Sequence, residues 1–126
     1  MSNNSLEKTA KEFIRAYNEK DFARMREMIA PNFYFQHHNR GFEFSDPEEF
    51  VATLKQFATE ALPDRGFGAA ERVTCTETTV VIQHSWGGTP KVDIPGMGNV
   101  GEKINLDLCS VMVFEGKLMT EYHDYG

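Results

Sequence analysis

The chain is 126 residues long, is 40% hydrophobic with ten phenylalanines, and carries a net charge of −6. This size and this amount of bulky apolar material predict one domain, residues 1–126, with a single sizeable core. Thirteen Lys and Arg oppose nineteen Asp and Glu without a basic cluster, which argues against nucleic acids and anionic membranes as partners. No apolar run reaches the length of a membrane span, and the N-terminal residues lack the features of a signal peptide. We therefore expect a cytoplasmic protein.

Three helices are predicted in the first half of the chain. Apolar residues at helical spacing over residues 6–17 predict the first helix. Asp21 is suited to cap a short second helix over residues 22–29. The string Asp46-Pro47-Glu48-Glu49 combines a cap, a proline in the first turn and an acidic third position, and it predicts a third helix that ends before Pro63.

Strands are predicted before the third helix and throughout the second half of the chain. The candidate segments are residues 32–38, 68–76, 79–89, 103–114 and 117–125. A loop rich in Gly and Pro, Gly87–Gly101, has the length of a functional cover or a contact surface. Helices followed by antiparallel strands predict an α+β fold, with three N-terminal helices packed in the concave face of a strongly curved, mainly antiparallel sheet. Such a sheet leaves a conical cavity.

Three histidines are expected on the inward faces of these strands. His37, His84 and His123 are each spaced by two residues from apolar or aromatic neighbours. Imidazoles in a buried pocket suit proton transfer near neutral pH, and burial would keep His84 neutral, as a general base requires. The alternatives are a core role for His84, a solvated rim or dimer contact for His123, and polar surface for His37.

Other residues are expected to complete an apolar pocket. The hydroxyl of Tyr17, on the apolar stripe of the first helix, would donate to a substrate oxygen or simply pack. Ser110, a small polar residue in an apolar row, would bind a ligand or water, or bond back to the sheet. No histidine pair has the spacing of known zinc motifs, so we expect neither a metal nor a cofactor. The pocket is predicted to be lined by Trp86, Phe35, Phe57 and Met112.

The opposite face of the sheet is predicted to need a cover. Asp107, Cys109, Val111 and Val113 alternate with the inward positions of their strand, so they should face outward. Three moderately apolar side chains in a row on an outer face predict a homodimer that forms through this face.

Several strings resemble one superfamily. They are residues 16–21 (AYNEKD) with 28–33 (MIAPNF), residues 105–118 (NLDLCSVMVFEGKL), and the closing Tyr122-His123-Asp124-Tyr125. They are similar to the SnoaL-like and nuclear-transport-factor-two-like proteins, which include ketosteroid isomerases, polyketide cyclases, limonene epoxide hydrolase and scytalone dehydratase. The resemblance covers nearly the whole chain and implies a cone-shaped α+β fold with a small-molecule pocket.

The resemblance also ranks the possible chemistries. The positions of the ketosteroid isomerase base, tyrosine and acid fall on or near His37, Phe13 and Ser110, which disfavours a steroid isomerase. SnoaL-like cyclases use a histidine and an aspartate, which His84 and either Asp107 or Asp124 would supply, although both aspartates alternate with the positions expected to face inward.

Two functions remain open from the sequence. The leading hypothesis is a SnoaL-like enzyme that uses histidine acid/base chemistry in an apolar cone on a small carbonyl- or hydroxyl-bearing substrate, as a cyclase, isomerase or dehydratase. The alternative is a non-catalytic dimeric binding module for a hydrophobic small ligand.

Overall fold

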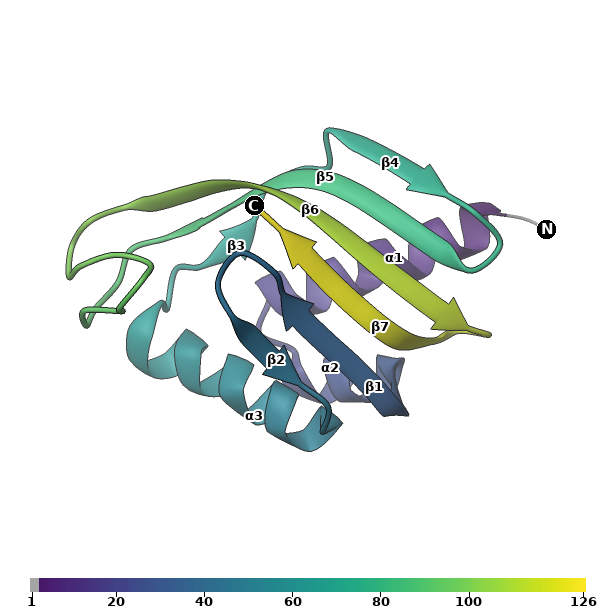
Figure 1. Ribbon diagram of the computed structural model, residues 1–126, viewed down its shortest axis with the longest axis horizontal. Helices are drawn as coiled ribbons and strands as arrows, with labels where there is room; N and C mark the ends of the chain where they lie inside the picture. The colour runs from purple at the N-terminus through teal and green to yellow at the C-terminus, as the bar shows by residue number, and fades with distance from the viewer. Residues whose placement is uncertain (1–2) are drawn as a thin grey trace.

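The computed structural model describes the backbone of residues 3–126 and the side chains of residues 5–126, and it confirms the predicted α+β fold (Figure 1). The helices are α1 (Asn3–Asn18), α2 (Phe22–Met28) and α3 (Pro47–Gln56), and α3 continues into a π-helical turn, η1 (Phe57–Ala61). The strands are β1 (Ile29–His37), β2 (Phe42–Phe44), β3 (Gly66–Phe67), β4 (Arg72–Cys75), β5 (Thr79–Gly88), β6 (Ile104–Glu115) and β7 (Leu118–Tyr125).

The strands form one curved, open sheet, and the helices lie on one of its faces (Figure 1). Its order is β2-β1-β7-β6-β5-β3, and β4 pairs with the other half of β5 on the same edge as β3. Among the described strands, only β1 and β7 pair in parallel, so the predicted antiparallel character holds for the rest of the sheet. Residues 89–103 project beyond the ends of β5 and β6 (Figure 1).

Local sequence signals explain where the second and third helices begin. The Asp21 carboxylate accepts the backbone N–H of Arg24 at 3.2 Å, and the Asp46 carboxylate accepts that of Glu48 at 2.9 Å. These bonds satisfy amide groups that a helix start would otherwise leave unpaired. Both caps are the residues predicted from the sequence.

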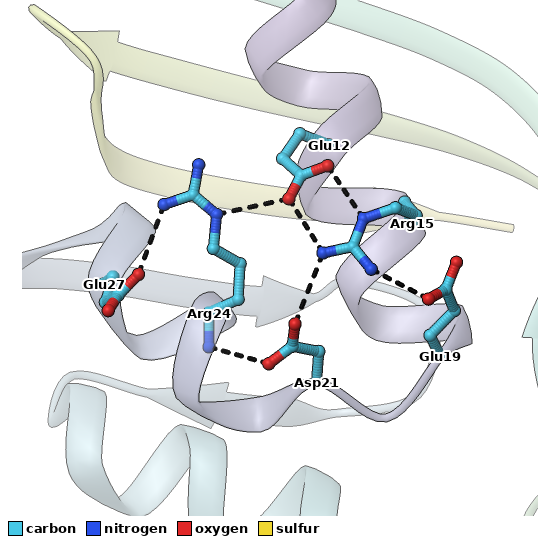
Figure 2. A network of polar contacts seen from close by, with 6 residues as sticks. All are labelled: Glu12, Arg15, Glu19, Asp21, Arg24 and Glu27. Atoms are coloured by element: carbon cyan, nitrogen blue, oxygen red, sulfur yellow. Dashed lines mark hydrogen bonds and ion pairs between the residues drawn. The ribbon is translucent and has the colours of Figure 1, made fainter.

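A network of charged side chains joins α1 to α2 (Figure 2). Glu12 on α1 accepts hydrogen bonds from Arg15 at 2.8 Å and from Arg24 of α2 at 3.2 Å, and Arg15 also reaches Asp21 at 3.3 Å. The hydrogen bonds from the two guanidinium groups, that of Arg15 foremost, lower the pKa of Glu12 to about 2. Because the network is exposed to solvent, we assign it a role in orienting the two helices and little part in stability.

Aromatic side chains fill the space between α3 and the sheet. Phe50 of α3 is buried, and its ring centroid lies 4.9 Å from that of Phe33, 5.0 Å from that of Phe35 and 6.5 Å from that of Tyr122. Three of these four rings also line the cavity described below. The core and the cavity therefore share side chains, and the core fixes the position of the cavity wall.

A β-bulge in β7 decides which side chains of the last strand face inward. Val113 of β6 pairs with Glu121, but the next residue, Phe114, pairs with Met119, so Thr120 is the extra residue. A bulge of this kind reverses the alternation beyond it. As a result Tyr122 and Asp124 are buried on the inner face, whereas Glu121, His123 and Tyr125 face outward. The sequence-based prediction that His123 faces inward and Asp124 outward is wrong for this reason.

Candidate functional site

A cavity of about 100 Å³ lies on the inner face of the sheet, at its α3 side. Its wall is mostly apolar and aromatic, and it includes Phe35, Phe42, Phe44, Phe50, Leu54, Phe57, Leu62, Phe67, Trp86, Met97 and Leu106. Among the described residues, few polar side chains reach the wall: Tyr17, His37, Thr53, Arg65, Tyr122 and Asp124. A largely apolar cavity with a few convergent polar groups is typical of a small-molecule site.

Asp124 places a carboxyl group on this wall. Its side chain is 5% exposed, and the Ser110 hydroxyl donates a hydrogen bond to Oδ1 at 2.6 Å. The two residues are direct cross-strand partners in β6 and β7. Burial raises the pKa of Asp124 to about 7, and the hydrogen bonds from Ser110 and Tyr122 only partly offset that effect. The carboxyl group is therefore poised to gain or lose a proton near neutral pH.

His84 supports this carboxyl group through Ser110. His84 is 3% exposed, and its Nε2 lies 2.9 Å from the Ser110 hydroxyl. Because that hydroxyl gives its proton to Asp124, we infer that Nε2 carries a hydrogen and donates to Ser110. Burial lowers the pKa of His84 to about 4, so the imidazole is neutral at pH 7. His84, Ser110 and Asp124 form a continuous chain of hydrogen bonds across three strands.

The His84 ring is held by Phe67 of β3, which is itself held by α1. It stacks on Phe67, with the ring centroids 4.3 Å apart and the ring planes 10° apart. Phe67 is fixed in turn by Asn18 of α1, whose amide accepts the Phe67 backbone N–H at 2.8 Å and donates to its carbonyl at 3.1 Å. His84 itself lies along a groove beside α1, outside the cavity wall. The sequence correctly predicted that His84 lies on the inner face, but its side chain does not line the cavity.

Tyr17 and Trp86 lie on the cavity wall, as predicted. The indole Nε1 of Trp86 donates to the Tyr17 hydroxyl oxygen at 2.9 Å. This bond uses a lone pair of the oxygen and leaves the phenolic proton available to a ligand. Burial raises the pKa of Tyr17, so the hydroxyl stays protonated at neutral pH.

The other two predicted histidines are separated by the sheet. His37, at the end of β1, lines the cavity, and its Nδ1 is buried without a hydrogen-bond partner among the described side chains. Burial, with smaller contributions from Arg40 and His38, lowers the pKa of His37 to about 4. His123 lies on the outer face, where it contacts His38 at 2.9 Å and Glu121 at 2.9 Å. It does not reach the cavity.

The remaining predicted residues differ in their distance from the cavity. Phe35 and Phe57 line it, whereas Met112 is completely buried in the core and is absent from the wall. Ser110, expected to bind a ligand, instead links two polar side chains. Arg65 was not predicted: it lies in the irregular segment between η1 and β3, where the sequence has no periodicity that would indicate burial.

The described part of the chain shows two further properties of the molecule. Within it, no three His, Cys, Asp or Glu side chains are grouped so that they could hold a metal ion. None of the described helices is long and apolar enough to cross a membrane.

An open α+β cone with a cavity between its helices and its sheet defines a known class of fold, and comparisons agree with it. The family model described as a SnoaL-like domain matches residues 10–122. No curated protein matches the chain.

Solved structures share the fold. A protein of Xanthomonas campestris pv. campestris named as a candidate polyketide cyclase aligns with a TM-score of 0.83 at 15% identity, covering 98% of this chain and 91% of that one. A second candidate polyketide cyclase, from Acidithiobacillus ferrooxidans, aligns with a TM-score of 0.76 at 25% identity, covering 98% and 89%. An LEH-like epoxide hydrolase of M. tuberculosis aligns with a TM-score of 0.73 at 13% identity, covering 94% and 79%.

The chain belongs to the SnoaL-like domain family, within the superfamily that the sequence resembles. At the level of the family, this membership supports a small-molecule enzyme or binder. It does not select a reaction, because one fold hosts many chemistries.

Proposed function

We propose that the protein is an enzyme that moves a proton on a small carbonyl- or hydroxyl-bearing molecule held in the cavity, with the Asp124 carboxyl group as acid and base. The observation that carries the proposal is this carboxyl group on an apolar wall, with its pKa raised to about 7 and one oxygen held by Ser110. A group with such a pKa is effective both in taking up and in releasing a proton at neutral pH.

The proposed step is proton abstraction next to a carbonyl group. The C–H bond breaks, the proton passes to the Asp124 carboxylate, and the electron pair moves onto the carbonyl oxygen. Tyr17 and His37 line the same cavity, and the Tyr17 hydroxyl and an imidazole N–H of His37 would donate hydrogen bonds to that oxygen. Return of the proton to another carbon of a conjugated substrate gives isomerisation. Attack of the carbanion on a second carbonyl carbon of the same molecule, whose oxygen then takes the proton from Asp124, gives cyclisation.

This proposal changes the roles that the sequence suggested for the histidines. His84 is a positioning residue here, because it acts on Asp124 through Ser110 and does not line the cavity. Of the predicted catalytic residues, His37 and Tyr17 keep a place on the wall. His123 has no part in the proposed mechanism, since it lies on the other face of the sheet.

The test is hydrogen exchange at the carbon next to a ketone, followed by NMR in D₂O with propiophenone and 3-benzoylpropanoate as probes. We expect the wild-type protein to accelerate exchange and Asp124→Asn to lose roughly 10²- to 10⁴-fold of the acceleration. Asp107→Asn, which changes an exposed carboxyl group on the outer face, is the matched control and should exchange like the wild type. Equal exchange by the Asp124 variant would refute the assignment of the base.

The alternative function is a binding module without turnover. It would be favoured if both probes bind the wild-type protein and neither exchanges faster than in buffer.

The homodimer remains a prediction. Cys109, Val111 and Val113 are half-buried on the outer face of the single chain, and a second copy would cover them. Sedimentation analysis tests it. The cytoplasmic location likewise remains a prediction.

A further inference from the structure

Arg65 places a buried positive charge on the cavity wall. Its side chain is 4% exposed, and neither Nη1 nor Nη2 has a hydrogen-bond partner among the described side chains and backbone. The guanidinium carbon lies 4.0 Å from the centroid of the Tyr17 ring and 5.9 Å from that of Phe22. These rings attract the flat face of the group, but they accept none of the N–H hydrogens that lie in its plane.

No carboxylate of the described residues forms an ion pair with this guanidinium. The neighbouring Asp64 is exposed, and its carboxylate instead accepts the backbone N–H of Thr89 at 2.7 Å. Burial lowers the pKa of Arg65, yet an arginine keeps its charge at neutral pH. Buried charges in proteins are normally paired, because an unpaired one is costly to remove from water. Arg65 is an exception, and an anionic ligand would pair its charge.

The backbone around Arg65 holds the side chain in this position. The Arg65 amide donates to the Leu62 carbonyl at 3.2 Å, and Gly88 packs so closely that a Cβ atom there would lie 3.1 Å from the Arg65 Cα atom. A long side chain in a surface loop would ordinarily extend its charged end into water. Here the Arg65 side chain is instead buried and lies on the cavity wall, next to β5.

We propose that Arg65 binds the carboxylate of a small, mostly apolar organic acid through Nη1 and Nη2, and that such acids are the substrate class of this site. That these acids are substrates rests on the proposed function, whereas their binding to Arg65 does not depend on it. A guanidinium matches a carboxylate with two parallel hydrogen bonds. A phosphate group carries more oxygens and more charge than one guanidinium satisfies, and Arg65 is the only Lys or Arg among the described residues of the wall.

The test is calorimetric binding of 3-benzoylpropanoate against its neutral amide, 3-benzoylpropanamide. We expect the wild-type protein to bind the acid roughly 10- to 100-fold more tightly, as charge-assisted hydrogen bonds imply. Arg65→Met should abolish this preference, and Arg65→Lys should keep part of it, because the charge remains and the two-pronged geometry is lost. Arg72→Met, which removes an exposed arginine of β4, is the matched control and should keep the full preference.

Thermal unfolding separates binding from folding. Methionine replaces an unpaired buried charge, so Arg65→Met should unfold at a temperature no lower than the wild type. The acid should raise the unfolding temperature of the wild type and leave that of the variant unchanged. Equal affinity for acid and amide, failure of the acid to bind at millimolar concentration, or an unchanged preference in Arg65→Met would each overturn the proposal. Tighter Arg65-dependent binding of phenyl phosphate would show that the anion is a phosphate and overturn the carboxylate.

Failure of this proposal is distinguishable from failure of the proposed function. Asp124→Asn should keep the preference for the acid over the amide, because Arg65 is unchanged in that variant. Preferential binding of the acid without exchange in the wild type would uphold the role of Arg65 and refute the enzyme. Exchange that depends on Asp124, with no preference for the acid, would uphold the enzyme and refute the role of Arg65.

Discussion

The raised pKa of Asp124 predicts how the stability of the protein changes with pH. The pKa of this buried carboxyl group is about 7 in the folded protein, against an ordinary value of 3.8. The folded protein therefore holds this proton more tightly than the unfolded chain does. The resulting stabilisation is complete below pH 4 and is lost as the pH rises through 7. Each pKa unit corresponds to about 1.4 kcal/mol, so the loss amounts to roughly 4 kcal/mol in total.

Asp124→Asn isolates this effect, because asparagine does not titrate and its side-chain oxygen can still accept the hydrogen bond from Ser110. We expect the wild type to lose roughly 2 to 3 kcal/mol relative to the variant between pH 5 and pH 8. Contributions of other titrating groups are common to both proteins and cancel in the difference.

Urea unfolding at pH 5, 6, 7 and 8 measures this difference, with the fluorescence of Trp86, the single tryptophan, as the signal. Asp107→Asn, on the outer face, controls for the loss of a carboxyl group as such and should leave the pH dependence of the wild type in place. Parallel stability curves for the wild type and Asp124→Asn would show that Asp124 titrates normally. The reasoning from burial would then be refuted.

Two further predictions concern the chain of hydrogen bonds behind Asp124. Ser110→Ala should lower the free energy of unfolding by roughly 1 to 3 kcal/mol, because it leaves two buried polar groups without their shared partner. Ser85→Ala, on the outer face of β5, is the control, and an equal loss there would contradict the prediction. His84→Phe should remove part of the acid sensitivity of folding. The pKa of His84 is lowered from 6.5 to about 4, so the wild type loses roughly 3 kcal/mol as the pH falls through that window. Urea unfolding between pH 4 and pH 7 measures it, and identical acid sensitivity in the variant would exclude His84 as the cause.

The pattern of the sequence was sufficient for the long, regular strands. His84, Trp86 and Ser110 face inward as their alternation with apolar residues predicted, because β5 and β6 pair without interruption over this stretch. The same rule failed on β7, where one extra residue at Thr120 reverses the faces. A strand read by itself has no signal for such a bulge, since the bulge is defined only by the residues of the partner strand.

The tertiary structure decided the positions of two polar residues on the cavity wall. The sequence pattern indicated Asp124 as a candidate but predicted that it faces outward, and it contained no sign that Arg65 would be buried. Charged residues in irregular segments usually point into water, so composition alone favoured exposure for Arg65. Arg65 is buried beside Gly88, which lies more than twenty residues away in the sequence.

The sequence by itself determined the class of fold, the order of its helices and strands, and an apolar interior that contains at least one histidine. These properties follow from periodicity and capping, which are local and can be recognised in a single segment. Only the tertiary structure decided which polar atoms meet in the cavity. That meeting depends on strand register and on contacts between distant segments, and a shift of one residue in register moves a side chain to the opposite face of the sheet.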